Sequence, residues 1–321
     1  MSESILNIEN LRVVFPTRMG DNITVDGINL TVNKGEIFGI VGESGCGKSM
    51  TSLSILRLIA PPGKITEGCI FVDGEDVLQM TEKEMQNKVR GSKVSMIFQE
   101  PMTSLNPLFT VGEQIMESLR THRHMSRKEA REEALQMLKL VGIPMPEKRL
   151  DEYPHTLSGG MRQRVMIAIA MSCHPKLLIA DEPTTALDVT IQAQILKLMK
   201  QLRDQEGTSV LLITHDLGVV ANMCDRVAVM YCGKVVEQGP TIELLKDPKH
   251  PYTRGLMGSV PSLSDDEKML YNIPGTVPRI IGGAVGCRFA DRCDRCTEIC
   301  RTVTPPCQQI NGEHAVWCHH V

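Results

Sequence analysis

The 321-residue chain lacks a long apolar segment, a basic leader and a positive net charge. Its longest apolar run, residues 165–171, is far shorter than the roughly 20 residues of a membrane-spanning helix. The opening sequence MSESILNIEN has no basic region followed by an apolar core, so we expect no signal peptide. We therefore expect a cytosolic protein, in which any role at a membrane depends on a partner.

The net charge of −3 argues against a general nucleic-acid binder, because such proteins are usually basic. The chain also lacks internal repeats and low-complexity tracts. Its content of 42% hydrophobic and 23% charged residues is ordinary for a globular protein, and its length is sufficient for two domains.

Cysteine, in contrast, is abundant, and its 11 residues are unevenly distributed. Clustered cysteines in cytosolic proteins form metal sites more often than disulfides. We therefore expect a metal site near the C-terminus, where six cysteines lie within the last 35 residues: Cys287, Cys293, Cys296, Cys300, Cys307 and Cys318.

The segment Gly42–Ser49 matches the phosphate-binding pattern G-x-x-x-x-G-K-[ST]. Its glycines allow backbone N–H groups to turn toward phosphate oxygens, Lys48 carries a positive charge to the β- and γ-phosphates, and the Ser49 hydroxyl suits Mg²⁺. The apolar run 37–41 predicts a strand before the segment, and apolar residues at helical spacing follow it. The sequence thus predicts a nucleotide site formed by Gly42, Ser44, Gly45, Cys46, Gly47, Lys48 and Ser49.

Strands and helices alternate along most of the chain, which predicts an α/β fold with a parallel sheet and helices on both faces. Alternating apolar residues at 5–35 predict antiparallel strands. Residues 111–141 have helical periodicity, interrupted by the polar stretch 121–124, which we expect to be a solvated loop. Proline and glycine become frequent after about residue 258. We expect one domain at 1–258, with a helical subdomain at about 100–172, and a small irregular Cys-rich domain at 259–321.

Further motifs follow in a fixed order: a glutamine at the end of a strand, LSGGM, an apolar strand ending in Asp-Glu, Ala-Leu-Asp, and a histidine. They are Gln99, Leu157–Met161, Leu177–Glu182, Ala186–Asp188 and His215. This set resembles the ATP-binding subunit of an ATP-binding cassette (ABC) transporter over roughly residues 5–240. The resemblance implies a P-loop NTPase cassette with an antiparallel β subdomain and a helical subdomain.

The resemblance also implies roles for single residues. Ser49, Gln99 and Asp181 would serve Mg²⁺. Glu182 would polarise the attacking water, and His215 would hydrogen-bond the γ-phosphate and that water. Gln99, Glu182 and His215 would be the catalytic residues. The family sandwiches two ATP molecules between two subunits, so the partner subunit's ATP would be contacted by Ser158, Gly159, Gly160 and Asp188.

Two positions carry an open question. Phe15 best matches the aromatic that stacks on adenine in the family, although burial in the core explains it equally well. Met161 stands where many relatives have glutamine, and we expect activity to survive this difference because that side chain is not the main phosphate contact.

Residues 239–253 and 99–107 resemble the oligopeptide, dipeptide and nickel importers of bacteria and archaea. That branch implies peptide uptake, a paralogous second ATPase subunit, two integral membrane permease subunits, an extracytoplasmic solute-binding protein, and a place at the cytoplasmic face of the cell membrane. Alternatives are a nickel or other small-solute importer, a soluble ABC ATPase of DNA repair or cluster assembly, and a regulatory subunit without hydrolysis. Glu182 and His215 argue against the last.

The cysteine tail resembles the C-terminal domain of the dipeptide-type ATPases, in which four cysteines hold a [4Fe-4S] cluster. The resemblance assigns this role to Cys287, Cys293, Cys300 and Cys318. Cys296 and Cys307 are additional, and Cys293-x-x-Cys296 is the spacing of a zinc knuckle. Zn²⁺ or free thiols therefore remain as alternatives.

Overall fold

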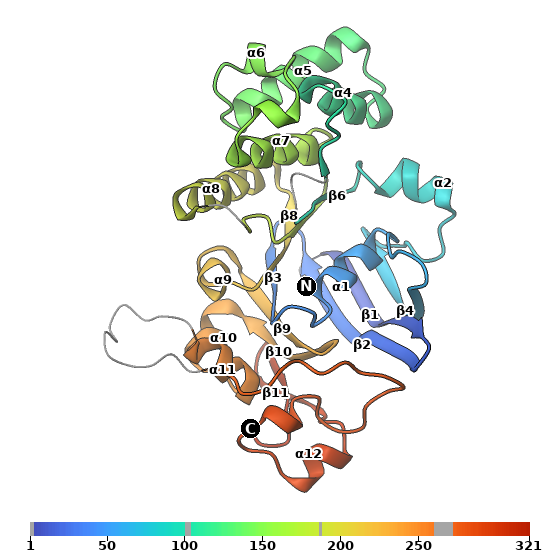
Figure 1. The fold of residues 1–321 in the computed structure, drawn as a ribbon, viewed down its shortest axis with the longest axis vertical. Coiled ribbons are helices and arrows are strands. Elements are labelled where there is room, and N and C mark those ends of the chain that lie inside the picture. Colours follow the sequence, from blue (N-terminus) through green and yellow to red (C-terminus); the bar gives the residue numbers. More distant parts are fainter. Residues whose placement is uncertain (1–2, 100–103, 186–187, 260–271) are drawn as a thin grey trace. The chain divides into compact units, whose positions relative to one another are not determined.

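The computed structural model describes residues 3–99, 104–185, 188–259 and 272–321. The chain divides into two compact units, which we describe separately (Figure 1). Unit 1 comprises Met1–Ile5, Asn33–Gly35 and Gln79–Leu211, and unit 2 comprises Leu6–Val32, Glu36–Leu78 and Leu212–Val321.

Unit 2 contains an antiparallel sheet with the strand order β2-β1-β4-β5. Buried and more exposed residues alternate along its strands, as expected when one face of a sheet packs on a core. This confirms the antiparallel strands predicted before the phosphate-binding segment. The strands are β1 (Ser4–Thr17), β2 (Gly20–Asn33), β4 (Lys64–Val72) and β5 (Glu75–Asp76).

A second sheet in unit 2 has the order β11-β12-β10-β9-β3. All five residues of β3 (Ile37–Val41) are buried, and β3 pairs in parallel with β9 (Arg226–Tyr231). Such continuous apolar strands are typical of a sheet covered on both faces. The remaining elements of this part are α1 (Lys48–Ile55), α9 (Leu217–Met223), β10 (Lys234–Pro240), α10 (Thr241–Lys246) and α11 (Pro251–Gly258).

Unit 1 contains the parallel pair β6 (Val94–Ile97) and β7 (Leu177–Asp181) and a group of helices. Between them the chain forms α4 (Val111–His122), α5 (Arg127–Leu140), α6 (Pro146–Arg149), η2 (Pro154–Thr156) and α7 (Gly159–Met171). Ahead of β6 lie α2 (Glu82–Glu84) and η1 (Met85–Val89), and after β7 lies α8 (Val189–Glu206). Strand β8 (Ser209–Thr214) leads from unit 1 into unit 2.

The polar interruption predicted at 121–124 lies at the break between two helices, although its first two residues still belong to α4. The chain breaks at His124, which has a positive φ of 53°, and α5 then starts from a capping box. In this box the Ser126 hydroxyl accepts a hydrogen bond from the Glu129 N–H, and the Glu129 carboxylate accepts one from the Ser126 N–H.

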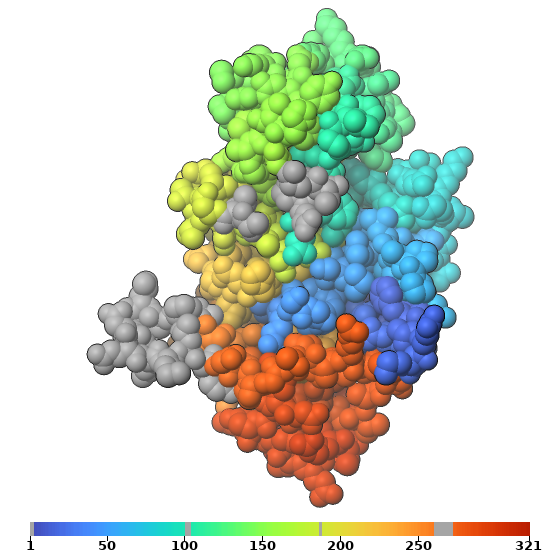
Figure 2. Space-filling view, in the orientation of Figure 1, coloured from blue at the N-terminus to red at the C-terminus, as the bar shows by residue number. Residues whose placement is uncertain are grey.

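The tail has more regular structure than its proline and glycine content predicts. It forms η3 (Ala290–Arg292), α12 (Glu298–Thr302), β11 (Cys307–Asn311) and β12 (His314–Trp317). Strand β12 pairs with β10, and Ile281 of the tail forms a bridge with Asn22 of β2. In Figure 2 the orange and red tail lies beside the blue N-terminal part of the chain. The boundary near residue 258 stays a prediction, although residues 212–321 belong to one compact unit.

A buried carboxylate joins the tail to β10. Glu237 is fully buried and accepts hydrogen bonds from the Lys249 and His250 N–H groups, at 2.7 and 3.0 Å. His314 Nε2 of β12 lies 2.8 Å from the same carboxylate. Such satisfied partners are required for a buried charge. Among the described residues, no helix is long and apolar enough to span a bilayer.

Candidate nucleotide site and cysteine cavity

The segment Gly42–Ser49, which we call the phosphate loop, connects β3 to α1 in unit 2. Two of its glycines are required by close backbone contacts. A Cβ atom on Gly47, whose φ is +106°, would lie 2.5 Å from the Thr24 carbonyl oxygen, and one on Gly42 would lie 2.2 Å from that of Met230. The loop therefore has the strand–glycine–helix geometry that the sequence predicts.

Lys48 is buried, and its ammonium group lies inside the loop. Nζ donates hydrogen bonds to the Gly42 and Glu43 carbonyl oxygens, at 2.7 and 3.1 Å. Cys46 is also buried, and this burial raises the pKa of its thiol. Ser44 and Gly45 are exposed at the tip of the loop, and Ser49 is half-buried in the first turn of α1.

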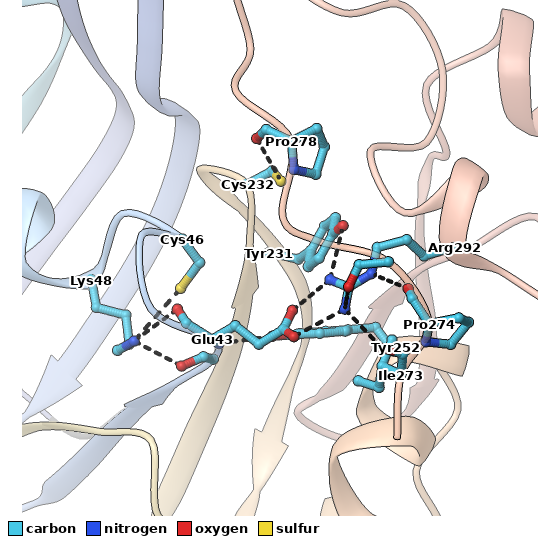
Figure 3. A network of polar contacts seen from close by, with 12 residues as sticks. Glu43, Cys46, Lys48, Tyr231, Cys232, Tyr252, Ile273, Pro274, Pro278 and Arg292 are labelled. Atoms are coloured by element: carbon cyan, nitrogen blue, oxygen red, sulfur yellow. Dashed lines mark hydrogen bonds and ion pairs between the residues drawn. The ribbon is translucent and has the colours of Figure 1, made fainter. Parts of the chain in front are cut away.

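A polar network behind the loop was missed by the sequence analysis (Figure 3). The Glu43 N–H donates to the Tyr252 hydroxyl at 2.9 Å. The Glu43 carboxylate accepts two parallel hydrogen bonds from Arg292, with Nη1–Oε2 at 2.7 Å and Nη2–Oε1 at 3.0 Å. The pKa of Arg292 is raised above its usual value, mainly by its hydrogen bonds to Glu43.

In unit 1 the structure brings together two residues that were predicted separately. Gln99 Nε2 donates to Glu182 Oε2 at 3.0 Å, and Thr185 Oγ1 donates to the same oxygen at 2.9 Å. Glu182 has a positive φ of 47°, and it follows Asp181, the buried last residue of β7. The end of β7 therefore holds one Glu182 carboxylate oxygen in a defined position. The residues after Gln99, 100–103, lie outside the described part of the chain.

The LSGGM segment, which we call the signature loop, opens helix α7 of unit 1. Ser158 is the N-cap and accepts a hydrogen bond from the Met161 N–H at 3.4 Å. Ser158 and Gly159 are exposed, and a Cβ on Gly159 would meet no heavy atom within 4 Å. The first N–H groups of α7 are therefore presented at the surface of this unit.

Three other predicted site residues lie outside the phosphate loop, the signature loop and the Gln99–Glu182 pair. Asp188 caps α8 by accepting a hydrogen bond from the Ile191 N–H at 2.9 Å, while its neighbours Ala186 and Leu187 are outside the described residues. His215 is exposed directly after β8 in unit 2. Phe15 is half-buried, with its ring edge against Gly63, where an added Cβ would approach it to 2.5 Å.

Four of the six tail cysteines line one small cavity in unit 2. They are the four that the resemblance to the dipeptide-type ATPases assigns together: Cys287, Cys293, Cys300 and Cys318. His250, Phe289, His319 and His320 also line it. Cys296 and Cys307 are not among its lining residues.

Thiol and imidazole side chains make up most of the lining of this cavity. Burial raises the pKa of Cys287 to about 11, and the Cys287 N–H donates to the Cys300 carbonyl at 2.7 Å. His250 Nε2 is buried and has no hydrogen-bond partner in the described structure. Over the described ranges, however, no group of three or more His, Cys, Asp or Glu side chains is arranged to hold a metal ion.

Known protein families match both the part of the chain that contains the phosphate loop and the part that contains most of the lining of the cysteine cavity. A family described as "ABC transporter" matches residues 25–185, and one described as "Oligopeptide/dipeptide transporter, C-terminal region" matches residues 236–300. The chain is 51% identical over 317 residues to the dipeptide transport ATP-binding protein DppD of Bacillus subtilis (strain 168), covering 98% of this chain and 94% of that protein.

It is also 52% identical over 320 residues to the oligopeptide transport ATP-binding protein OppD of the same organism, covering 98% of this chain and 89% of that protein. The fold matches the dimeric structure of MJ0796, a bacterial ABC transporter cassette, with a TM-score of 0.66 and 31% identity over 74% of this chain and 98% of that one. The chain therefore belongs to the ABC transporter family, among the ATP-binding subunits of its oligopeptide and dipeptide branch.

Proposed function

We propose that this chain is the ATP-hydrolysing motor of an importer of dipeptides or oligopeptides. The observation that carries this is the combination, in one chain, of a formed phosphate loop with the C-terminal region of oligopeptide and dipeptide transporters. Full-length similarity to peptide transport ATP-binding proteins supports the same substrate class. An importer of nickel or another small solute is the alternative within this branch.

The proposed chemistry follows from the residues at the strand ends. Lys48 and the loop N–H groups would bind the β- and γ-phosphates, because both carry positive charge. Ser49, Gln99 and Asp181 would hold Mg²⁺, which neutralises charge on the phosphates when bound. Glu182 would orient and polarise the attacking water, and the hydrogen bonds from Gln99 and Thr185 would fix the direction of its carboxylate. His215 would hydrogen-bond the γ-phosphate.

The proposed partners follow from the exposed signature loop. Ser158, Gly159, Gly160 and Asp188 would contact ATP bound to a second cassette, which we expect to be a paralogous subunit. ATP binding would close this pair, and closure would act on two integral membrane permease subunits that receive solute from an extracytoplasmic binding protein. The chain would work at the cytoplasmic face of the membrane and would bind no nucleic acid.

We further propose that Cys287, Cys293, Cys300 and Cys318 hold a [4Fe-4S] cluster, since thiolates are the usual ligands of such clusters. The four thiols that line one cavity support this proposal. Zn²⁺ takes both cysteine and histidine ligands, and His250, His319 and His320 line the same cavity, so zinc is the alternative that metal analysis decides.

Metal analysis tests the cluster. Anaerobically purified protein should be brown, with iron and sulfide in near-equal amounts, and Cys300→Ser should lower both. The matched control is Cys307→Ser, because Cys307 is exposed and does not line the cavity. A colourless protein that contains zinc would rule out the cluster and leave zinc as the ligand.

The variant Glu182→Gln tests the motor. It keeps the size of the side chain but removes the base, so we expect turnover to fall about 100-fold or more while ATP still binds. The cassettes should then remain associated with ATP, which size-exclusion chromatography would detect. The control is Glu206→Gln, at the end of α8. Normal turnover by Glu182→Gln would refute the role given to Glu182.

A further inference from the structure

We propose that Arg292, a residue of the C-terminal region, is a positioning residue for the phosphate loop. Its guanidinium group holds Glu43 and thereby fixes the backbone on which Lys48 depends. The C-terminal region would then contribute directly to ATP affinity. This inference rests on the proposed binding of ATP by the phosphate loop. The variants of Arg292 test the positioning role, and Lys48→Ala tests separately whether ATP binds at this loop.

The ion pair is well enclosed. The Arg292 side chain is 6% exposed and that of Glu43 is 29% exposed. Both guanidinium nitrogens engage the carboxylate in the fork geometry that makes arginine–carboxylate pairs strong and directional. A pair of this kind has a more defined geometry than a surface salt bridge.

Arg292 is itself held by its surroundings (Figure 3). Its Nε donates to the Pro274 carbonyl at 2.8 Å, and its Nη2 lies 3.4 Å from the Ile273 carbonyl. Its Nη1 donates to the Tyr231 hydroxyl at 3.3 Å, and the guanidinium carbon lies 5.7 Å from the centre of that ring. The guanidinium therefore has one orientation, and Glu43 takes its position from it.

The backbone of Glu43 is part of the phosphate loop, so the position of its side chain also constrains the loop. The Glu43 N–H is bound to the Tyr252 hydroxyl, and the Glu43 carbonyl accepts a hydrogen bond from Lys48 Nζ at 3.1 Å. A shift of Glu43 would therefore move both the loop and a partner of the ammonium group that the proposed site directs at phosphate. The N–H, the carbonyl and the carboxylate of Glu43 are therefore all hydrogen-bonded, and the partner of the carboxylate, Arg292, is 249 positions away in the sequence.

An aromatic cluster supports the same face of the loop. The ring centres of Tyr231 and Tyr252 are 4.7 Å apart, and Phe289 lies 5.2 and 5.3 Å from them. The Tyr231–Phe289 contact is edge-on, a geometry that stabilises packing beyond area burial alone, and the other two ring pairs are tilted. Phe289 and Arg292 belong to the same short segment of the tail, so the tail is built against the loop through both apolar and ionic contacts.

The negative charge of Glu43 gives a second reason why loss of Arg292 should weaken ATP binding. Glu43 places a carboxylate in a loop that would bind a polyphosphate, and Arg292 neutralises it. Without the guanidinium, the carboxylate would repel the anion. Loss of Arg292 should therefore weaken ATP binding both by loosening the loop and by exposing this negative charge, and removal of the Glu43 charge should reverse the second effect.

The experiment measures the MgATP dissociation constant, together with KM and kcat, for Arg292→Gln, Glu43→Gln and the double variant. For Arg292→Gln we expect Kd and KM to rise about tenfold, with kcat within about twofold, since this corresponds to losing one charge-assisted pair. The double variant should recover to within about threefold of wild type. A general loosening of the tail would not be reversed by a change at Glu43.

Three controls complete the test. Arg301→Gln removes an exposed tail arginine that pairs with Asp291 and should leave Kd unchanged. Arg292→Lys keeps the charge but loses the fork, so it should raise Kd about threefold, and it replaces Arg292→Gln if that variant does not fold. Lys48→Ala should abolish ATP binding if the loop is the site. An unchanged Kd in the Arg292 variants, with ATP binding lost in Lys48→Ala, would overturn the inference alone.

Discussion

The phosphate loop and the signature loop have the same kind of phosphate-binding geometry, but the first is largely buried and the second is exposed. Both are glycine-containing segments at the N-terminus of a helix, where free N–H groups and the helix dipole favour phosphate. In the phosphate loop, Cys46, Gly47 and Lys48 are buried, and Tyr252 and Arg292 brace the segment from distant parts of the chain. In the signature loop, Ser158 and Gly159 are exposed and the cap is made within the helix itself.

This difference indicates how one chain can serve two nucleotides. A loop that is enclosed by its own unit is suited to hold the chain's own ATP in a fixed geometry. A loop that exposes its N–H groups, with open space around Gly159, is suited to bind phosphate brought by another molecule. The proposed function therefore predicts that the two loops respond differently to mutation.

The largest effect is expected for Lys48→Ala. This change removes the buried ammonium group, and with it both its charge and its hydrogen bonds to the loop carbonyls. ATP affinity of the isolated chain should fall at least about 100-fold, because charge neutralisation dominates phosphate binding. Equilibrium binding of a fluorescent ATP analogue measures it, with Lys200→Ala on the exposed side of α8 as the control. Retained affinity would place the nucleotide elsewhere.

A selective effect is expected for Gly159→Arg. The isolated chain should fold and bind ATP within about twofold of wild type, because Gly159 is exposed and a Cβ atom there meets no heavy atom within 4 Å. Turnover of the assembled transporter should fall about 30-fold or more, since the arginine would occupy the face offered to the second cassette. Glu132→Arg, on exposed α5, is the matched control. Loss of ATP binding by the isolated chain would contradict the division of roles.

The smallest effect is expected for Ser158→Ala. An N-cap serine contributes about 0.5–2 kcal/mol, and the Ser158 bond is long, at 3.4 Å. Its third helical residue is Met161, so it has no reciprocal partner, whereas Ser126 forms a complete capping box with Glu129. Thermal unfolding should therefore show a smaller loss of melting temperature for Ser158→Ala than for Ser126→Ala. The reverse order would contradict the assignment of Ser158 to function rather than stability.

Local pattern was sufficient to predict the phosphate loop with its flanking strand and helix. The four cysteines that share a cavity were predicted from the resemblance to the dipeptide-type ATPases, because spacing alone did not separate them from Cys296 and Cys307. The break between α4 and α5 was also predicted, from the polar stretch 121–124, and the capping-box spacing of Ser126 and Glu129 marks the start of α5. Gln99 and Glu182 were predicted from motifs, and only the fold shows that they touch.

The pairing of Glu43 with Arg292 could not be predicted in this way. The two residues are 249 positions apart, and neither periodicity nor a motif links them. Strands β11 and β12 were missed for a related reason, since short strands in a proline-rich tail are determined by the partner strand β10. Contacts distant in sequence are thus the part that the structure adds.

The most direct measurement is photoaffinity labelling of the assembled transporter with an azido-ATP, read separately on this chain and on the second cassette subunit. We expect Lys48→Ala to abolish labelling of this chain and to leave the second subunit labelled. Gly159→Arg should instead preserve labelling of this chain and reduce that of the second subunit. If both variants abolished labelling of this same chain, the two loops would serve one nucleotide, and the proposed division of roles between them would be wrong.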